Sequence, residues 1–419
     1  MTKYKRKLDD QAKIFSLSFN KQDTSMFRIS ISLNEKIESK ILKEAVNETI
    51  KYFKDFKVKI KKGLLWHYFI ENNQEILIHR EEEYDFKNIH NKDNNYYLFK
   101  IIYEDNTISI DYFHLLTDGL RANKFLTEIA YKYIEIKNKL DKQKNKIMYK
   151  AYNAYTSNYP KKTQKPYKVP FAFRIKGTKL NTEEISVNKI KINLPELKEY
   201  SKKQNVSITN TLISLLTYAI YNSYYKNSKS KRSINICVPI DLNNIFKENT
   251  ISNFVSHMML TIKLNKNKKY TLTEINELVT KEFNEKVSEE SVLATMKSDG
   301  KSINNPFVNI IPLPLKKLVV VLGSHIFKRT FTITLTNLGK ISYDSKYEKY
   351  IKDTSIILPP DWCEPIRCAI SSYNETLTFT FASNIEEQYL QQSFIKELNN
   401  LKIKYTIENN DINPLKKEV

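Results

Sequence analysis

Regular alternation of apolar and polar residues predicts several short strands in the first third of the chain. Residues 107–113 read TISIDYF, with apolar side chains at every second position, which is typical of a strand with one buried face. The polar residues 104–106 precede this strand and favour a hairpin turn. The further segments with strand character are residues 27–33, 56–60, 65–70 and 97–103. We therefore expect a largely antiparallel sheet.

Apolar residues at helical spacing predict helices beside this sheet. They recur every three or four positions through residues 36–53 and again after Gly119. Residues 114–119 therefore lie on a turn between the 107–113 strand and a helix. Protein scaffolds commonly present reactive side chains on turns of this kind.

The second half of the chain predicts another sheet with helices, after a crossover of different character. Residues 137–168 carry Lys, Asn, Gln and Tyr without steady periodicity, and prolines occur at positions 160, 166 and 170. The predicted strands that follow are residues 187–192, 233–242, 331–338, 368–373 and 376–382. The predicted helices are residues 196–204, 212–224, 271–286 and 385–401. The whole pattern indicates an α+β chain with two similar layered subdomains.

Length and composition are those of a globular protein with substantial cores. The chain has 419 residues, of which 41% are hydrophobic, so it is long enough for two domains. Its three cysteines are too few for a disulfide framework, which fits a cytoplasmic location. Residues 1–10 lack the apolar segment of a signal peptide, and residues 310–322 are interrupted by two prolines and two lysines. We therefore expect no membrane span.

A formal net charge of +21 raises the question of a nucleic-acid partner. The 68 basic residues are mostly lysines scattered among Asn and Ile, without an Arg-rich run, zinc-finger spacing or an RNP-like motif. We therefore interpret the charge as a solvated basic surface and expect no nucleic-acid binding. Such a surface would still favour an anionic ligand.

His114, Asp118 and Gly119 carry the candidate chemistry of the strand-to-helix turn. His114 can act as a general base near neutral pH. Asp118 can pair with a buried base or cap the helix, and Gly119 lets the backbone turn tightly. The alternative is a histidine that merely satisfies a turn. The other histidines lack a supporting neighbour pattern, no His, Cys and carboxylate spacing suits a metal, and no GxSxG motif is present.

Four stretches of the chain resemble one enzyme superfamily. Residues 114–119, HLLTDG, resemble the HxxxDG motif of the CoA-dependent acyltransferases, which include chloramphenicol acetyltransferase, peptide-synthetase condensation domains and alcohol acetyltransferases. Residues 238–254, VPIDLNNIFKENTISNF, resemble the VPVNLRxxFPSxTxxNFF pattern of bacterial alcohol acetyltransferase-like proteins. Residues 336–339, TNLG, stand where that group carries SNLG. The helix pair predicted in residues 197–220 resembles the one that opens the second half of these enzymes.

Two positions depart from these patterns. Asn243 stands where the bacterial pattern has Arg, so the sequence leaves the partner of Asp118 unidentified. Phe113 replaces the first histidine of the HHxxxDG form of condensation domains, whereas the second is retained as His114.

The resemblance implies two chloramphenicol-acetyltransferase-like subdomains, residues 1–160 and 175–419, joined by a linker at 161–174, with an active-site tunnel at their junction. It implies acyl transfer from CoA to an alcohol or amine, with acetyl-CoA as a co-substrate and no permanently bound cofactor or metal. His114 would be the general base and Asp118 its structural support. Because one chain supplies both halves, a monomer would be sufficient.

The sequence leaves two questions open. One is the role of the TNLG stretch, and the other is the nature of the acyl donor. Thr336, Asn337 and Gly339 would donate hydrogen bonds to the oxyanion or the substrate, or would only shape a loop. The donor could be a carrier-protein thioester in place of CoA. From a different class, the chain could be a non-catalytic relative that binds a metabolite.

Overall fold

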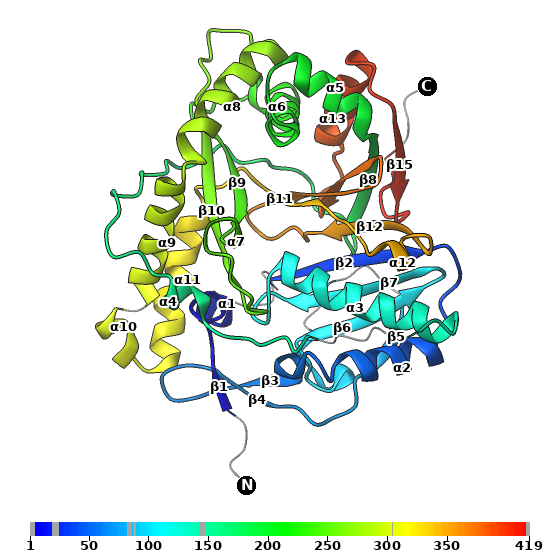
Figure 1. Ribbon diagram of the computed structural model, residues 1–419. Coiled ribbons are helices and arrows are strands. Elements are labelled where there is room, and N and C mark those ends of the chain that lie inside the picture. Colours follow the sequence, from blue (N-terminus) through cyan, green and yellow to red (C-terminus); the bar gives the residue numbers. More distant parts are fainter. Residues whose placement is uncertain are drawn as a thin grey trace.

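The computed structural model describes residues 5–18, 25–81, 86, 89–141, 147–303 and 305–415, which form helices and three β-sheets. The sheets have three, five and seven strands (Figure 1). The three-stranded sheet has the order β1-β4-β3, with bounds Lys5–Lys7, Tyr68–Glu71 and Val58–Lys61. This α+β architecture confirms the predicted fold class.

The five-stranded sheet forms the core of the first half. Its order is β12-β2-β7-β6-β5, with bounds Ile351–Ile357, Met26–Leu33, Thr107–Phe113, Phe99–Glu104 and Ile78–Arg80. Ile110 pairs with Ile29 and Ile108 with Ile31 between β7 and β2, so the alternating apolar face of the predicted strand is buried. Helices α2 (Ser39–Thr49) and α3 (Gly119–Lys137) pack together beside this sheet (Figure 1). The neighbouring strands are antiparallel except for β5 and β6.

The seven-stranded sheet forms the core of the second half. Its order is β10-β9-β11-β13-β14-β8-β15, with bounds Val255–Ile262, Ile234–Asp241, Ile333–Lys340, Ile366–Tyr373, Thr376–Ser383, Ser186–Asn193 and Tyr405–Asn409. It is a mixed sheet because β11 runs parallel to both β9 and β13. The helices that share its apolar core are α5 (Leu194–Lys203), α6 (Ile208–Ile220), α8 (Leu272–Lys286) and α13 (Tyr389–Asn400).

Local sequence signals explain where these helices begin. The Ser207 side chain accepts a hydrogen bond from the backbone N–H of Asn210 and caps α6. Thr271 and Glu274 form a reciprocal capping box at the start of α8. Pro195 lies in the first turn of α5, where no intrahelical donor is needed. The predicted helices of this half are therefore confirmed, with α13 starting four residues later than expected.

Several elements were not predicted from the sequence. The longest are α9 (Glu289–Ile303) and α11 (Leu313–Lys328), which are linked by the short α10 (Pro306–Ile310). Helix α1 (Asp10–Ser18) precedes the first long strand. Short helical elements outside the predicted helices are η1 (Lys54–Phe56), η2 (Lys92–Asn94), α4 (Ala154–Ser157), α7 (Asn243–Phe246) and α12 (Ser345–Glu348). Element η3 (Tyr221–Tyr225) directly continues α6 and overlaps the helix predicted over residues 212–224.

Strand β12 connects the two halves, although it was not predicted. It comes late in the chain and pairs antiparallel with β2, placing Ile356 opposite Ile29 (Figure 1). On its other side, the Ser371 hydroxyl in β13 donates a hydrogen bond of 3.1 Å to the Thr354 carbonyl. The second half of the sequence thus completes the sheet of the first half. The subdomain boundaries at 160 and 175 stay a prediction.

In the part of the chain that the structure describes, no helix combines the length and apolar character needed to cross a bilayer. The same residues contain no cluster of three or more His, Cys, Asp or Glu side chains that could hold a metal ion.

Substitution of Ile356 tests how strongly β12 stabilises the five-stranded sheet. Because its side chain is buried in that core, we expect Ile356→Ala to lower the free energy of unfolding by about 2–5 kcal/mol. Chemical denaturation followed by circular dichroism measures this change. Lys352→Ala, at an exposed position of the same strand, should have a much smaller effect. Similar small losses for both variants would contradict this contribution of β12.

Candidate active site

His114 lies at the end of β7, partly buried between two aromatic rings. Its ring stacks on Phe15 of α1, with centroids 4.3 Å apart, and meets the ring of Phe27 edge-on at 5.1 Å. Its backbone N–H donates a hydrogen bond of 2.8 Å to the carbonyl of Ser25. Both the backbone and the ring of His114 are therefore held in place.

Asn253, from the loop before β10, fixes the protonation pattern of His114. The Asn253 Nδ2 group donates to the His114 carbonyl at 2.9 Å, which orients the amide. Its Oδ1 atom then lies 3.0 Å from His114 Nδ1 and can only accept, so Nδ1 carries the proton. In the neutral ring the lone pair is therefore on Nε2, the atom that a general base uses.

The surroundings of His114 also favour its neutral form. Burial lowers the pKa of His114 below the ordinary value, because the charged imidazolium loses its hydration. The negative charge of Asp118 opposes this shift but does not cancel it. The ring is consequently unprotonated at neutral pH, as a general base requires.

Asp118 is buried and joins the strand-to-helix turn to the loop before β10. Its carboxylate caps α3 by accepting from the Arg121 backbone N–H at 3.2 Å. The same carboxylate accepts a hydrogen bond of 2.8 Å from the backbone N–H of Phe254. It therefore does both things that its position suggested, because it caps a helix and also pairs with a buried cation.

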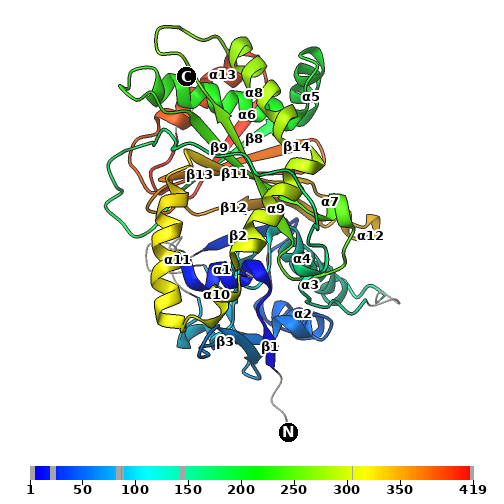
Figure 2. The same cartoon turned by 90° about the vertical axis from the view of Figure 1, so that its left-hand side faces the viewer.

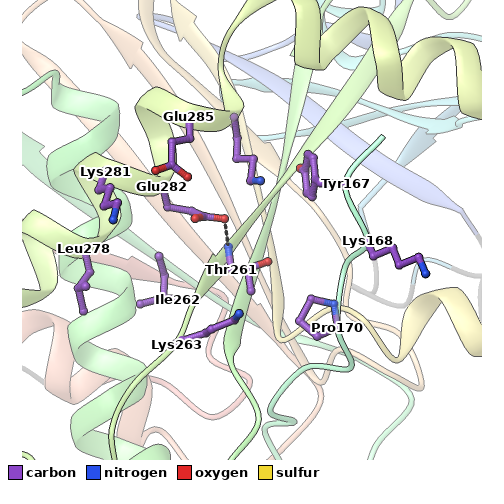
Figure 3. A pocket seen from close by; sticks show the side chains of 11 residues that line it. Tyr167, Lys168, Pro170, Thr261, Ile262, Lys263, Leu278, Lys281, Glu282 and Glu285 are labelled. Carbon is purple, nitrogen blue, oxygen red and sulfur yellow. Dashed lines mark hydrogen bonds between the residues drawn. The ribbon is translucent and has the colours of Figure 1, made fainter. Parts of the chain in front are cut away.

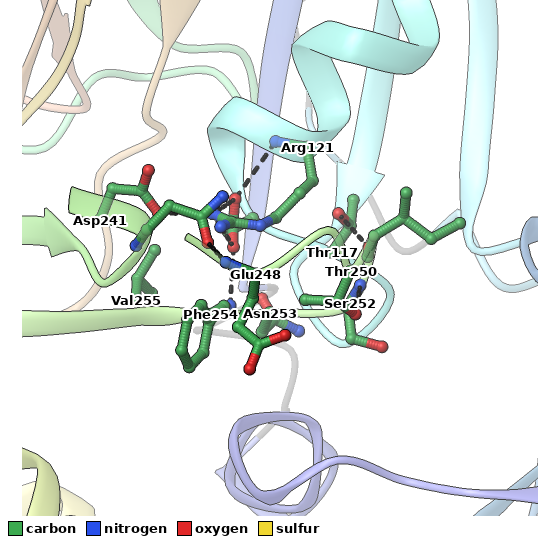
Figure 4. Close-up of polar contacts among 12 residues, drawn as sticks. Thr117, Arg121, Asp241, Glu248, Thr250, Ser252, Asn253, Phe254 and Val255 are labelled. Carbon is green, nitrogen blue, oxygen red and sulfur yellow. Dashed lines mark hydrogen bonds and ion pairs between the residues drawn. The ribbon is translucent and has the colours of Figure 1, made fainter. Parts of the chain in front are cut away.

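Arg121 is the cation that the sequence left unidentified. Its Nη1 atom lies 3.1 Å from both oxygens of Asp118 and 2.8 Å from Oδ1 of Asp241, the last residue of β9 (Figure 4). Asn243, where the related pattern has Arg, instead accepts from the Glu248 N–H and holds its own turn. The basic partner thus comes from α3, three residues after Asp118. That spacing is the sequence signal that could have identified it.

One further contact closes this junction between distant segments. The Thr117 hydroxyl donates a hydrogen bond of 2.9 Å to the carbonyl of Ile251 (Figure 4). The turn at residues 114–119 is thus bound to residues 251–254, more than a hundred positions downstream. The structure brings together two of the stretches on which the resemblance rests.

Gly119 and Leu338 bring the third stretch to the same place. A Cβ atom on Gly119 would lie 3.0 Å from Cδ2 of Leu338 and 3.8 Å from Cδ1 of Ile356. Gly119 has no positive φ, so the close approach of these side chains explains the glycine better than the predicted tight turn. Gly339 does have a positive φ of 70°, at the irregularity where β11 departs from its register with β13.

The polar residues of the TNLG stretch are engaged in shaping their own loop. Asn337 donates through Nδ2 to the Thr209 hydroxyl at 3.2 Å and accepts from the Gly339 N–H at 2.7 Å. Thr336 is paired with Ala369 in the ladder between β11 and β13. These contacts support the loop-shaping alternative for Asn337, and an oxyanion role for Thr336, Asn337 and Gly339 stays a prediction.

A half-open pocket lies elsewhere, between the crossover, β10 and α8 (Figure 3). It has a volume of about 340 Å³, and Glu282 at its wall accepts a hydrogen bond of 3.1 Å from the Thr261 N–H. None of its lining residues is a predicted site residue. We therefore centre the candidate site on His114.

Substitution of Arg121 tests the charge cluster that it forms with Asp118 and Asp241. Replacing it by Met leaves two carboxylates in the junction without their cation, so we expect the free energy of unfolding to fall by about 3–5 kcal/mol. Denaturant titration measures the loss, and Arg80→Met, at an exposed position of β5, serves as the matched control. Equal stability of the two variants would contradict a stabilising role for the ion pairs of Arg121.

Comparison with known proteins identifies the fold. No family model and no curated protein matches the sequence. Among solved structures, F. graminearum TRI101 complexed with coenzyme A and T-2 mycotoxin is similar at a TM-score of 0.65 and 9% identity, over 96% of this chain and 99% of that one. The TRI3 trichothecene 15-O-acetyltransferase from Fusarium sporotrichioides gives 0.61 and 11% over 94% and 95%. The starter condensation domain of rhizomide synthetase, a mutant in complex with C8-CoA and Leu-SNAC, gives 0.61 and 9% over 95% and 94%. The chain therefore has the chloramphenicol-acetyltransferase-like fold that these solved structures share, as its motifs predicted.

Proposed function

We propose that the protein transfers an acyl group, with acetyl as the first candidate, from CoA to an alcohol or amine, using His114 as the general base. The observation that carries this proposal is the bond from His114 Nδ1 to Asn253, which leaves the basic lone pair on Nε2. A histidine that merely satisfied a turn would not need an amide fixed from a distant loop. The fold shared with structures that contain CoA or acyl-CoA supports the donor class.

The reaction follows from a base with this orientation. His114 Nε2 removes the proton from the acceptor hydroxyl or amine as that atom attacks the thioester carbonyl. The resulting tetrahedral oxyanion collapses and expels the CoA thiolate, which takes up the proton held by the imidazolium. The ring returns to its neutral state, and no covalent acyl-enzyme is needed.

Other residues of the cluster would hold this base and balance its charge. Asp118 lies close enough to stabilise the imidazolium during the reaction, and Arg121 holds that carboxylate in place through contacts of 3.1 Å to both of its oxygens. Asp118 is thus a positioning residue in this proposal and not a second base. Thr336 or Asn337 would supply the oxyanion donor if the loop rearranges when substrate binds.

Both walls of this site come from one chain. Residues 114–121 and 251–254 hydrogen-bond directly to each other, so the proposed activity does not need a second subunit. This supports the expectation of a monomer. The net charge of +21 would favour the anionic CoA over a neutral donor.

The most direct test is release of free thiol from acetyl-CoA in the presence of a panel of alcohols and amines. We expect turnover by the wild-type protein and a loss of about 10²–10⁴-fold in kcat for His114→Ala. His257→Ala is the matched control, because His257 is a partly buried histidine in β10 that faces Asp299 and Phe327. Its turnover should remain close to wild type.

The outcomes of this assay separate the alternatives. Turnover that survives His114→Ala would remove the general-base assignment. Turnover only with an acyl group on a carrier-protein thioester would replace CoA as the donor. Metabolite binding without thiol release from either donor would indicate a non-catalytic relative.

The pH dependence of kcat/KM tests the surroundings of the base. Activity should be lost as the pH falls through the pKa of His114, and burial places this acid limb below that of an ordinary histidine. Asn253→Asp puts a negative charge beside the Nδ1 proton and stabilises the imidazolium, so the limb should move up by about one unit. Asn374→Asp in the exposed β13–β14 turn makes the same charge change and should leave the limb in place. A limb that does not move in Asn253→Asp would contradict the contact with Nδ1.

A further inference from the structure

Helix α11 turns its apolar stripe outward. Five of its apolar side chains recur at the spacing of a single helix face and are each 59–61% exposed: Leu315, Leu318, Val319, Leu322 and Ile326. Its inner face contains the buried Lys316, whose Nζ atom donates to the carbonyl of Leu65 at 2.7 Å and lies over the Trp66 ring. A surface helix normally places its apolar stripe against the core. Helix α11 has the reverse arrangement.

Neighbouring segments extend this apolar surface. Phe307 and Ile310 of α10 are 75% and 70% exposed, and Leu64 in the β3–β4 connection is 81% exposed. The Leu313 N–H donates to the Leu64 carbonyl at 3.0 Å, and Trp66 Nε1 donates to Asn309 at 3.1 Å, so the segments are joined. We call the eight exposed residues the apolar ridge: Leu64, Phe307, Ile310, Leu315, Leu318, Val319, Leu322 and Ile326. Figure 2 shows α10 and α11 along one side of the molecule.

The segments that carry the ridge contain basic residues and no acidic ones. No Asp or Glu lies between Asp299 and Asp344, or between Asp55 and Glu71. Lys317 lies on α11, and Lys61 and Lys62 precede Leu64 in the chain; all three are exposed. Burial, with the positive charges of Lys317 and Lys62, lowers the pKa of His67 to about 4, which places both lysines near one point.

The other end of the ridge is also basic. Arg329 follows directly after α11 and lines a pocket of about 320 Å³ with Arg174, Lys176, Arg232 and Phe171. The ridge therefore has cationic groups at both of its ends. Exposed apolar side chains with lysine and arginine around them are the features of a helix that lies in the interface of an anionic bilayer.

The positive charge around the ridge favours a lipid surface over a second copy of this chain as its binding partner. A twofold contact through the ridge would bring its basic surroundings toward those of the second copy, and neither acid-free segment offers a carboxylate to pair with them. An anionic phospholipid surface accepts both the apolar side chains and the cations. We propose that the apolar ridge binds the surface of an anionic phospholipid bilayer, with α11 lying in the plane of the membrane.

This surface lies one helix away from the candidate base. Helix α11 packs against α1, and Phe15 of α1 stacks on His114. Membrane binding does not depend on the proposed acyl transfer, because it uses exposed residues on a different face. If both hold, the site would be close to substrates that partition into the bilayer.

Flotation of the full-length protein with vesicles tests this proposal. We expect binding to vesicles that contain phosphatidylglycerol, much weaker binding to phosphatidylcholine alone, and release by salt. Leu318→Gln combined with Leu322→Gln should reduce binding by at least about tenfold. The matched control is Met148→Gln combined with Tyr389→Gln, two exposed apolar residues outside the ridge, and it should bind as wild type does.

A second set of variants separates charge from apolar contact. Replacing Lys61, Lys62 and Lys317 by Gln should weaken binding on the order of a hundredfold. The charge-matched control replaces the exposed Lys198, Lys202 and Lys396, which lie on α5 and α13, and should weaken it far less. The circular dichroism spectrum of each variant confirms that it is folded.

Three outcomes would overturn the proposal. The first is failure of the wild-type protein to float with either vesicle, and the second is equal binding by the ridge variant and its control. The third is a wild-type dimer in sedimentation equilibrium that dissociates in Leu318→Gln with Leu322→Gln, without vesicle binding. That result would assign the ridge to a second copy of the chain.

Discussion

The candidate site depends on the hydrogen bonds and the ion pair made by the buried carboxylate of Asp118. A buried carboxylate is tolerated only when nearby donors and a cation replace its hydration. Here the donors are the N–H groups of Arg121 and Phe254, and the cation is the Arg121 side chain. Because these partners come from α3 and from the loop before β10, satisfying one charge holds two distant parts of the chain together.

The position of His114 follows from this junction. The loop that reaches Asp118 through Phe254 also carries Asn253, so the same backbone geometry delivers the amide that orients the imidazole. Burial lowers the pKa of the ring, and the charge of Asp118 and the hydrogen bond to Asn253 partly offset the shift. A site built in this way keeps a neutral histidine at physiological pH while a nearby carboxylate stands ready to stabilise its charged form.

The fold also organises the excess positive charge. In sequence, the lysines are scattered and indicate only a solvated basic surface. In the structure, the β3–β4 connection and α11 meet, and each brings a segment without acidic residues. Basic residues from two places in the chain thereby surround one apolar ridge. The chain consequently has a polar, tightly bonded junction at the candidate site and an exposed apolar surface on the other side of α1.

The sequence by itself determined the elements whose signals are local. The strand Thr107–Phe113, the start of α3 and the capped helices α6 and α8 follow from periodicity and caps within a few residues, and the motif turn was placed correctly between β7 and α3. Only the tertiary structure decided the partners of these elements. The pairing of Ile356 with Ile29 and the contact of Asn253 with His114 join residues far apart in the chain, and no local pattern encodes them. Likewise, the apolar stretch at residues 310–322 did not predict α11, and a helical repeat would not reveal which way its apolar face points, because periodicity is the same whether that face is buried or exposed.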